Sequence, residues 1–320
     1  MLGEFVPRNV AAKLAERGRG LPGHLIDFSR DTVDACYNRR PFLVSHHLDE
    51  HPAFRLPTLF SLCRRLPPSE VKYRVGVIPD TADFDSSYAR FSQGLSLDDV
   101  LDRFEESRAY ICIYNPERDP AYRPILEGIL CEVAAAIEPC DPHITWYSTY
   151  IFISTQDSVT PYHMDREMNF LLQVRGTKHV ALWDPADDEV MSPADRDRLL
   201  SMFGSQRATY SPSFESKAMH YDLRPGIGVH HPFIAPHRVT TGAELSISLA
   251  FTFRTHKSDK LTSAHAFNYL LRRCGWLPEE VGHSAIADEV KVVASNAAKV
   301  PISLLQKAWR ARRMARRMPA

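Results

Sequence analysis

The stretch from Ile144 to Arg254 limits the folds open to this chain more than any other part of it. It reads as short, apolar and β-branched runs separated by turn residues, at 144–154, 170–174, 179–183, 227–231 and 245–254. Closely spaced short strands are typical of a β-sandwich or barrel and argue against a doubly wound sheet, in which helices alternate with strands. The sequence therefore predicts a mainly β core.

Helical patterns flank this core on both sides. Upstream, the sequence predicts a helix over residues 1–20, a helix capped by Ser29, further helices over 56–66, 97–104 and 125–137, and strands at 41–44, 73–78 and 110–114. Downstream, the pattern is helical over 264–274, 278–281 and from 285 to the end. A chain of 320 residues can hold one large domain with an appendage. We expect a domain over residues 1–255 with N-terminal helical decorations, and a C-terminal helical extension over 256–320.

Composition and charge exclude several classes of protein. Lys plus Arg and Asp plus Glu both number 39, so no overall field attracts the chain to nucleic acid or to an anionic surface. The six cysteines form no CxxC pair, and there is no apolar signal segment and no apolar run long enough to cross a bilayer. These features predict a cytoplasmic protein with free thiols. The absence of a GxGxxG or GxxxxGK[ST] motif argues against the common nucleotide-cofactor enzymes.

Three residues have the chemistry of a metal site. His163 and Asp165 are two positions apart, so on an extended strand both side chains project to the same face, and His237 can complete a set of two histidines and one carboxylate. Such a facial triad binds iron(II) and leaves coordination positions open. An HxD pair by itself occurs by chance in many chains, and a lone His163 would be a core histidine bonded to a backbone carbonyl. The neighbouring residues favour the metal site.

Those neighbours have the chemistry needed to hold an anionic ligand. Lys178 follows a turn at Gly176 and can pair with the far end of a dicarboxylate, while Thr160 and Asn169 flank the HxD pair and offer hydroxyl and amide groups. Two alternatives stay open. Lys178 can be a solvated lysine at a strand edge, and Arg254 is a competing partner for the carboxylate.

Other residues near these motifs are expected to be structural. We expect His230 and His231 to lie on the same β run as His237, but consecutive residues on a strand point to opposite faces. We therefore predict that both are structural, with the alternative that one of them lines the pocket. Aromatic residues on strands are usually part of the core, and we predict this for Tyr73, Tyr110, Tyr147 and Tyr150, with the barrel mouth as their alternative position.

In order and spacing, these motifs resemble those of the JmjC and cupin-like hydroxylases, the family that contains the asparaginyl hydroxylase acting on hypoxia-inducible factor. That family has a TPxHxD segment, an Asn, a GxK strand and a distal His after a Gly-containing strand and a proline. The chain supplies Thr160–Asp165, Asn169, Gly176–Lys178, Pro225–Gly226 and His237. The resemblance covers residues 25–255. It departs from the family at Ile227, where an acidic residue is usual, and at 234–236, where Ile-Ala-Pro replaces a tryptophan pair.

The resemblance implies a fold, a cofactor set and a reaction. The fold is a double-stranded β-helix, or jelly-roll, with iron(II) held at its mouth by His163, Asp165 and His237. Lys178 would bind the 5-carboxylate of 2-oxoglutarate, assisted by Thr160 and Asn169. With O2, such a dioxygenase hydroxylates a C–H bond and releases succinate and CO2. We expect a peptide or amino-acid-like substrate.

Other functions and partners stay open. One alternative is a non-catalytic cupin-like binding or regulatory protein, and others are an oxygenase acting on tRNA or a small metabolite, a demethylase, or a metal cupin of different chemistry. Residues 307–320 carry six cationic side chains and no acid, which favours a solvated helix end. Related hydroxylases dimerise through C-terminal helices, so the resemblance also raises a homodimer. Contact of the basic tail with nucleic acid or an anionic membrane is a weaker alternative.

Overall fold

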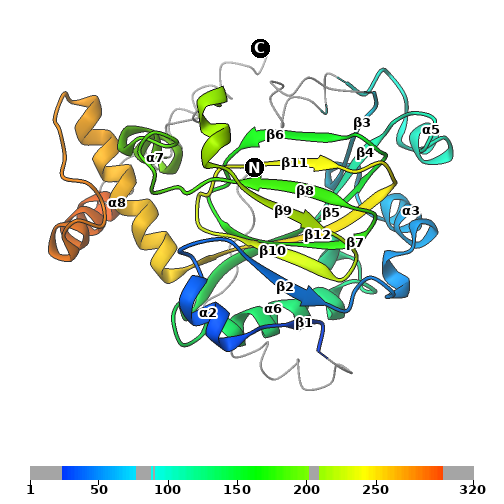
Figure 1. Ribbon diagram of the computed structural model, residues 1–320, viewed down its shortest axis with the longest axis horizontal. Helices are drawn as coiled ribbons and strands as arrows, with labels where there is room; N and C mark the ends of the chain where they lie inside the picture. The colour runs from blue at the N-terminus through cyan, green and yellow to red at the C-terminus, as the bar shows by residue number, and fades with distance from the viewer. Residues whose placement is uncertain (1–23, 77–87, 89–90, 202–208, 298–320) are drawn as a thin grey trace, which may run out of the picture. The chain divides into compact units, whose positions relative to one another are not determined.

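The computed structural model describes residues 24–76, 88, 91–201 and 209–297 (Figure 1). The chain divides into two compact units, one made of Met1–Val190 and Thr209–His256 and the other of Met191–Ala208 and Lys257–Ala320. The expected helix over residues 1–20 and the basic tail lie outside the described residues. The expected domain boundary at residue 255 stays a prediction.

The first unit contains two antiparallel sheets. The larger sheet has eight strands in the described residues, in the order β1-β2-β10-β7-β12-β5-β4-β3. Their bounds are β1 Ile26–Asp27, β2 Phe42–His46, β10 Ile227–His231, β7 Met168–Arg175, β12 Ser246–Thr255, β5 Ile144–Ser154, β4 Tyr110–Tyr114 and β3 Val71–Arg74. The smaller sheet has the order β6-β11-β8-β9, with β6 Val159–His163, β11 His237–Thr241, β8 Lys178–Leu182 and β9 Met219–Leu223.

The two sheets face each other across an apolar interior. Figure 1 shows the smaller sheet in front of strands β10, β7, β12 and β5 of the larger one. Side chains from both sheets fill the space between them: Leu171, Val229 and Ala250 from the larger sheet, and Val180, Leu182, Leu223 and Val239 from the smaller. This interior confirms the prediction of a mainly β, jelly-roll core with flanking helices.

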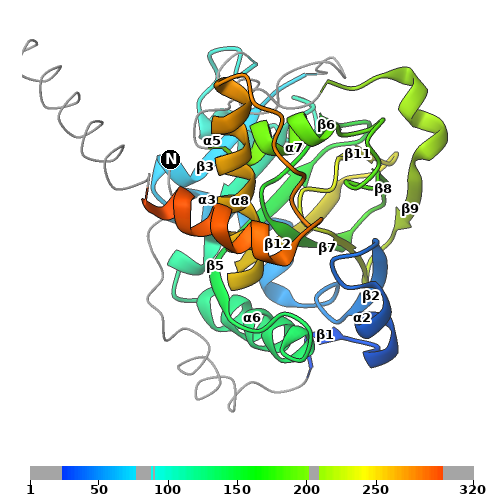
Figure 2. The same ribbon diagram turned by 90° about the vertical axis from the view of Figure 1, so that its left-hand side faces the viewer.

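The other face of the large sheet is also buried. Phe170 contacts Phe42, Phe253 and the ring of His230, and Figures 1 and 2 place α2 (Arg30–Cys36) and α6 (Arg123–Ile137) close to these strands. A sheet covered on both faces buries successive residues of a strand, which agrees with β7, where every residue except the last is buried. The remaining helices of this unit include α3 (Leu56–Arg65) and α5 (Leu97–Asp102).

The second unit contains α7 (Pro193–Leu200), α8 (His256–Arg273) and a helical segment over residues 285–297. The carboxylate of Asp197 on α7 is buried and accepts hydrogen bonds from His265 Nδ1 and Arg272 Nε of α8, both at 2.7 Å. This network ties α7 to α8. No helix among the described residues is both long and apolar enough to cross a membrane, and the expected cytoplasmic location stays a prediction.

Several elements differ from the expectation. α8 begins at His256, eight residues before the expected helix, and residues 278–281 do not form a helix. Strand β3 covers 71–74, where we expected 73–78, and residues 77 and 78 lie outside the described part. Strands β1, β9 and β11 and helix α7 were not predicted. His237 lies on β11 and not on the run of His230 and His231, which is β10, because the chain leaves the larger sheet after His231 and enters the smaller one at His237. Strands β9 and β11 are short and contain His, Asp, Arg or Thr at alternate positions, so their apolar signal is weak.

Candidate metal centre

Two histidines face each other across the smaller sheet. His163 is the last residue of β6 and lies opposite His237, the first residue of β11, with ring centroids 4.1 Å apart. His163 Nδ1 donates to the carbonyl of Pro161 at 2.7 Å, and His237 Nδ1 donates to that of Ala235 at 3.0 Å. A proton on Nδ1 places the lone pair on Nε2. Both rings are therefore held in the tautomer that binds a metal through Nε2.

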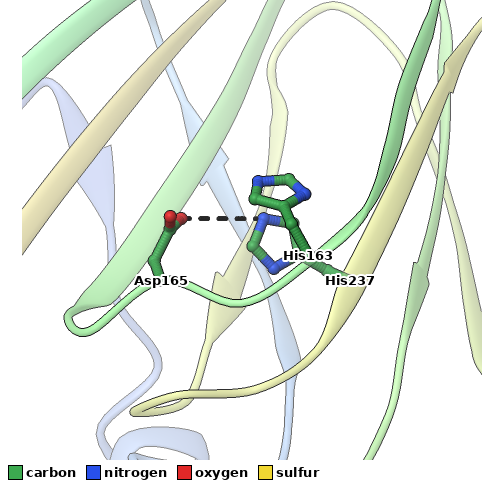
Figure 3. Close-up of side chains that lie close together, drawn as sticks. All are labelled: His163, Asp165 and His237. Atoms are coloured by element: carbon green, nitrogen blue, oxygen red, sulfur yellow. Dashed lines mark ion pairs between the residues drawn. The ribbon is translucent and has the colours of Figure 1, made fainter. Parts of the chain in front are cut away.

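Asp165 completes the group. One of its carboxylate oxygens lies 3.7 Å from His237 Nε2, and one potential ligand atom from each of the three residues lies within 4.8 Å of the others (Figure 3). The expectation that His163 and Asp165 share an extended strand is wrong, because β6 ends at His163 and Asp165 lies in the connection to β7. Pairing with β11 stops at His163 because the chain leaves the smaller sheet there to join the larger one.

Solvent reaches this centre from one side. The side chain of Asp165 is 35% exposed, whereas that of His237 is 6% exposed, and His163 is buried. The two imidazoles therefore form the inner wall of the centre. A molecule arriving from solvent meets the centre on the side of the carboxylate.

Lys178 is the first residue of β8, and its ammonium group lies inside the barrel. Its Nζ donates to Ser248 Oγ at 2.5 Å and lies 5.4 Å from the centroid of the Phe152 ring. Within the described residues Lys178 forms no ion pair with a carboxylate, although it is only 4% exposed. The reading of Lys178 as a solvated edge lysine is therefore wrong. Burial lowers the pKa of Lys178 to about 7.

A glycine at the turn before β8 allows this placement. Gly176 has φ +66°, and a Cβ there would lie 2.4 Å from the carbonyl oxygen of Leu245. Any larger residue at this position would push the turn away from the start of β12. The register of β8 against β11, in which Lys178 lies opposite Thr241, depends on that close approach.

Thr160 and Tyr110 lie together in the same barrel. Thr160 is buried on β6, and its hydroxyl is 3.4 Å from that of Tyr110 on β4. The guanidinium of Arg74 lies over the Tyr110 ring at 4.3 Å and donates to the carbonyl of Val159 at 2.6 Å. Tyr110 was expected in the core, with the barrel mouth as the alternative, whereas Ser248 is an interior polar residue that was not predicted for the site. The alternation of Ser246, Ser248 and Ala250 with larger apolar residues along β12 is the signal that could have revealed Ser248.

Asn169 lies at a different level of the barrel from Lys178. On β7 Asn169 lies opposite His231, whose ring is 4.6 Å from that of the metal-site residue His237. Gln173, further along β7, lies opposite Ser248, which accepts the hydrogen bond of Lys178. Asn169 and Gln173 are four residues apart, about 13 Å along a strand. Asn169 is therefore at the metal end, and Thr160 is better placed than Asn169 to share a ligand carboxylate with Lys178.

Arg254 also lies at the metal end. Its guanidinium lies 4.9 Å from the centroid of the Trp146 ring. Burial and the charge of Asp165 raise the pKa of Glu167 to about 7, and the nearby charge of Arg254 partly opposes this rise. Arg254 and Ser248 are six residues apart on β12, about 20 Å along the strand. The two candidate cations thus lie at opposite ends of the barrel.

Comparison with known proteins agrees with this geometry. A jelly-roll barrel of two packed antiparallel sheets is the fold of the cupin class of proteins. The chain belongs to the cupin-like domain family, whose model matches residues 79–259. No curated protein sequence matches the chain.

Solved structures give more distant matches. The X-ray structure of E. coli YcfD has a TM-score of 0.46 and 14% identity, covering 82% of this chain and 63% of that one. The E. coli ribosomal oxygenase YcfD gives 0.47 and 13%, covering 88% and 68%. Its complex with cobalt and 2-oxoglutarate gives 0.44 and 14%, covering 87% and 68%. The chain thus spans about two thirds of the length of these proteins.

The buried Lys178 makes the stability of the ligand-free protein depend on pH. Its pKa is lowered from 10.5 to about 7 by burial, so between these values the unfolded chain binds more protons at this residue than the folded chain does. The free energy of unfolding should therefore rise with pH across this window, by up to about 1.4 kcal/mol per pH unit. Urea unfolding at pH 7, 8 and 9 measures it, with Lys178→Met as the reference that lacks the group. A difference between the two proteins that stays constant with pH would contradict the burial of a titrating ammonium.

Proposed function

We propose that this protein is an iron(II)- and 2-oxoglutarate-dependent oxygenase that hydroxylates a C–H bond. The observation that carries the proposal is the presence of two complementary groups in one barrel. These are the His163, Asp165 and His237 cluster at one end and the buried, carboxylate-free ammonium of Lys178 at the other. A metal cupin of different chemistry needs the first group, but it has no need for the second.

The donor set suits iron(II). Two imidazole nitrogens and one carboxylate oxygen form the facial arrangement that non-haem iron oxygenases use. Both histidines donate Nδ1–H to backbone carbonyls, which fixes the rings for metal binding through Nε2. The three residues supply one ligand atom each, so half of an octahedral coordination sphere stays open for other ligands.

The barrel interior suits a dicarboxylate. A buried ammonium without a carboxylate partner is costly, and a ligand carboxylate would supply the missing charge. Ser248 and the Thr160–Tyr110 pair offer hydroxyl groups in the same interior. Lys178 lies opposite Thr241, four residues from His237 on β11, or about 13 Å along the strand. A lysine side chain and a five-carbon diacid together can span this interval.

Different residues of the chain would bind the metal, bind the co-substrate and exclude water. When bound, iron and 2-oxoglutarate would supply an oxidative decarboxylation, in which 2-oxoglutarate and O2 are converted to succinate and CO2 while one oxygen atom hydroxylates the substrate. His163, Asp165 and His237 would hold the metal from one side. Lys178 would orient the far carboxylate, while apolar residues such as Leu171 and Val239 exclude water from the interior.

We further propose a peptide or amino-acid side chain as substrate, delivered to the exposed side of Asp165. This side is where solvent reaches the centre, so a group carried on a larger molecule can approach it there. Substrates such as modified tRNA or a small metabolite are the competing candidates. The intact His, Asp and His cluster argues against a non-catalytic binding protein.

Binding of both cofactors without oxygen tests this function. We expect one iron(II) per chain, followed by one 2-oxoglutarate that binds tightly only when the metal is present. Anaerobic calorimetry gives both stoichiometries. A protein that binds neither iron(II) nor 2-oxoglutarate would support the non-catalytic alternative instead.

We also propose a homodimer formed through the C-terminal helical unit. Ile286, Val290 and Val293 on the helical segment over 285–297 are each more than 60% exposed and follow the i, i+4, i+7 spacing of one helix face. Trp276 and Leu277 in the same unit are also exposed. Exposed apolar stripes of this kind mark protein interaction surfaces.

Substitution in this stripe should change the oligomeric state. Val290→Asp puts a charge in the proposed apolar interface, so the mutant should be a monomer at concentrations where the wild type is a dimer. Light scattering coupled to gel filtration measures the mass. Glu289→Asp, a neighbouring exposed change, should leave the dimer intact. A wild-type monomer at all concentrations would rule out the dimer.

A further inference from the structure

His231 is a buried imidazole beside the metal centre that has no role in the function described so far. It is the last residue of β10, is 3% exposed, and its ring lies 4.6 Å from that of His237 in a T-shaped contact. It points to the same side of the sheet as Val229, two residues away, which lies in the barrel interior. The ring therefore faces the interior of the barrel at its metal end.

Neither ring nitrogen of His231 has a hydrogen-bond partner in the structure. The neighbouring His230 provides a contrast, because its Nδ1 donates to the carbonyl of Asn169 and its Nε2 accepts from the amide of Asn38. His230 also packs between Tyr37, Phe42 and Phe170. The expectation of a structural role thus suits His230. It does not explain His231, since burying an imidazole without hydrogen bonds is unfavourable.

A second unpartnered polar atom lies next to His231. Asn169 is directly opposite it on β7, and the side-chain Oδ1 of Asn169 is buried without a hydrogen-bond partner. Residues directly opposite each other in antiparallel strands have Cβ atoms roughly 4.5–5.5 Å apart. The two side chains therefore form a polar pair on the interior face of the barrel, and this pair adjoins His237.

We propose that His231 is a positioning residue that donates a hydrogen bond to an oxygen of the small ligand held at the metal, with Asn169 beside it. The inference rests on the proposed function, in which that ligand is 2-oxoglutarate and the oxygen belongs to its metal-binding end. Lys178 would hold the opposite end of the same molecule. The ligand would thus be held by a hydrogen-bonding pair at one end and by an ammonium group at the other.

Two observations favour this ligand over other occupants. His231 is not a member of the cluster whose ligand atoms lie within 4.8 Å of one another, so its geometry is not that of a fourth metal ligand. It is also buried on the inner side of the centre, whereas Asp165 is the exposed member. A substrate arriving from solvent would meet Asp165 first, whereas the His231 ring faces the barrel interior, where the proposed ligand would lie.

Calorimetry and thermal unfolding of three variants test the proposal. His231→Leu removes both ring nitrogens at similar volume, His231→Gln keeps a donor, and His230→Leu is the matched control on the opposite face. Iron(II) affinity and then 2-oxoglutarate affinity are measured anaerobically, together with the Tm of each protein without ligands.

We expect His231→Leu to bind 2-oxoglutarate about 10- to 100-fold more weakly, the effect of one hydrogen bond to a charged group. Its iron affinity should be unchanged, and its ligand-free Tm should equal or exceed that of the wild type, because an unpartnered buried imidazole is gone. His231→Gln should recover most of the affinity. His230→Leu should lower the Tm and leave the affinity for 2-oxoglutarate intact.

Three results would overturn the proposal. One is an unchanged 2-oxoglutarate affinity in His231→Leu, or in His231→Met, which also lacks a donor, if the leucine variant does not fold. Another is a loss of iron affinity instead, which would make His231 a metal ligand. The third is a fall in Tm with no change in binding, which would make it structural. If the wild type itself does not bind 2-oxoglutarate, this result contradicts the proposed function, and the role of His231 that depends on it is contradicted as well.

Discussion

Replacing Asp165 by alanine should abolish iron(II) binding and 2-oxoglutarate turnover while the barrel stays folded. Asp165 supplies the only carboxylate in the described His, Asp and His cluster, and it lies in a connection between strands, where its removal breaks no sheet pairing. A metal centre contributes several kcal/mol to the barrier of its reaction, so we expect turnover to fall by at least about a thousandfold. Metal content and anaerobic iron titration measure the binding, and circular dichroism checks the fold.

Asp222→Ala is the matched control for this substitution. Asp222 is a highly exposed aspartate on β9 that pairs with His179, also at the surface. Exposed pairs of this kind contribute little to stability, so the control should bind iron as the wild type does. Full iron binding by Asp165→Ala would show that the cluster is not the metal site.

The second large effect is expected at Lys178. Lys178→Met should weaken 2-oxoglutarate binding by at least about 30-fold, because losing one member of a buried charge pair costs about 2–5 kcal/mol. Iron binding should persist, because Lys178 lies away from the cluster. The ligand-free variant should also be more stable than the wild type, since methionine fills a similar space without a desolvated charge. Calorimetry of the iron-loaded protein gives the affinity, and Tm gives the stability.

Arg254→Met is the control that separates the two candidate cations. Arg254 lies at the metal end of the barrel beside Trp146, so its loss should leave 2-oxoglutarate affinity within about threefold of the wild type, as expected for a residue without a direct contact. The opposite pattern, with affinity lost in Arg254→Met and kept in Lys178→Met, would reverse the assignment.

Much of the fold could be predicted from the sequence because the large sheet is buried on both faces. Strands such as β5 and β12 are long and rich in β-branched and aromatic residues, so their predicted bounds agree with the observed ones to within one residue. The short strands β9 and β11 of the smaller sheet alternate polar residues with buried ones, and their signal is close to that of a loop. Their pairing with β8 is a long-range contact that local patterns do not contain.

The site residues also differ in whether local sequence or long-range pairing determines their role. His163, Asp165 and Lys178 could be predicted as site residues, because they belong to HxD and GxK motifs within one short stretch of the sequence. The roles of His231 and Ser248 depend on which strand lies opposite, since Ser248 meets Lys178 across two sheets and His231 meets Asn169 across one. Such juxtapositions follow from the register of the folded barrel, and adjacent positions such as His230 and His231 can be told apart only by their partners.

The most direct test of the proposed oxygenase is succinate formation from 2-oxoglutarate by the purified protein with iron(II), ascorbate and O2, measured beside Asp165→Ala. We predict succinate release by the wild type, increased by a suitable peptide substrate and absent in the variant. Equal succinate formation by both proteins would contradict a role for this centre. A wild type that forms no succinate and binds neither iron(II) nor 2-oxoglutarate would contradict the proposed function itself.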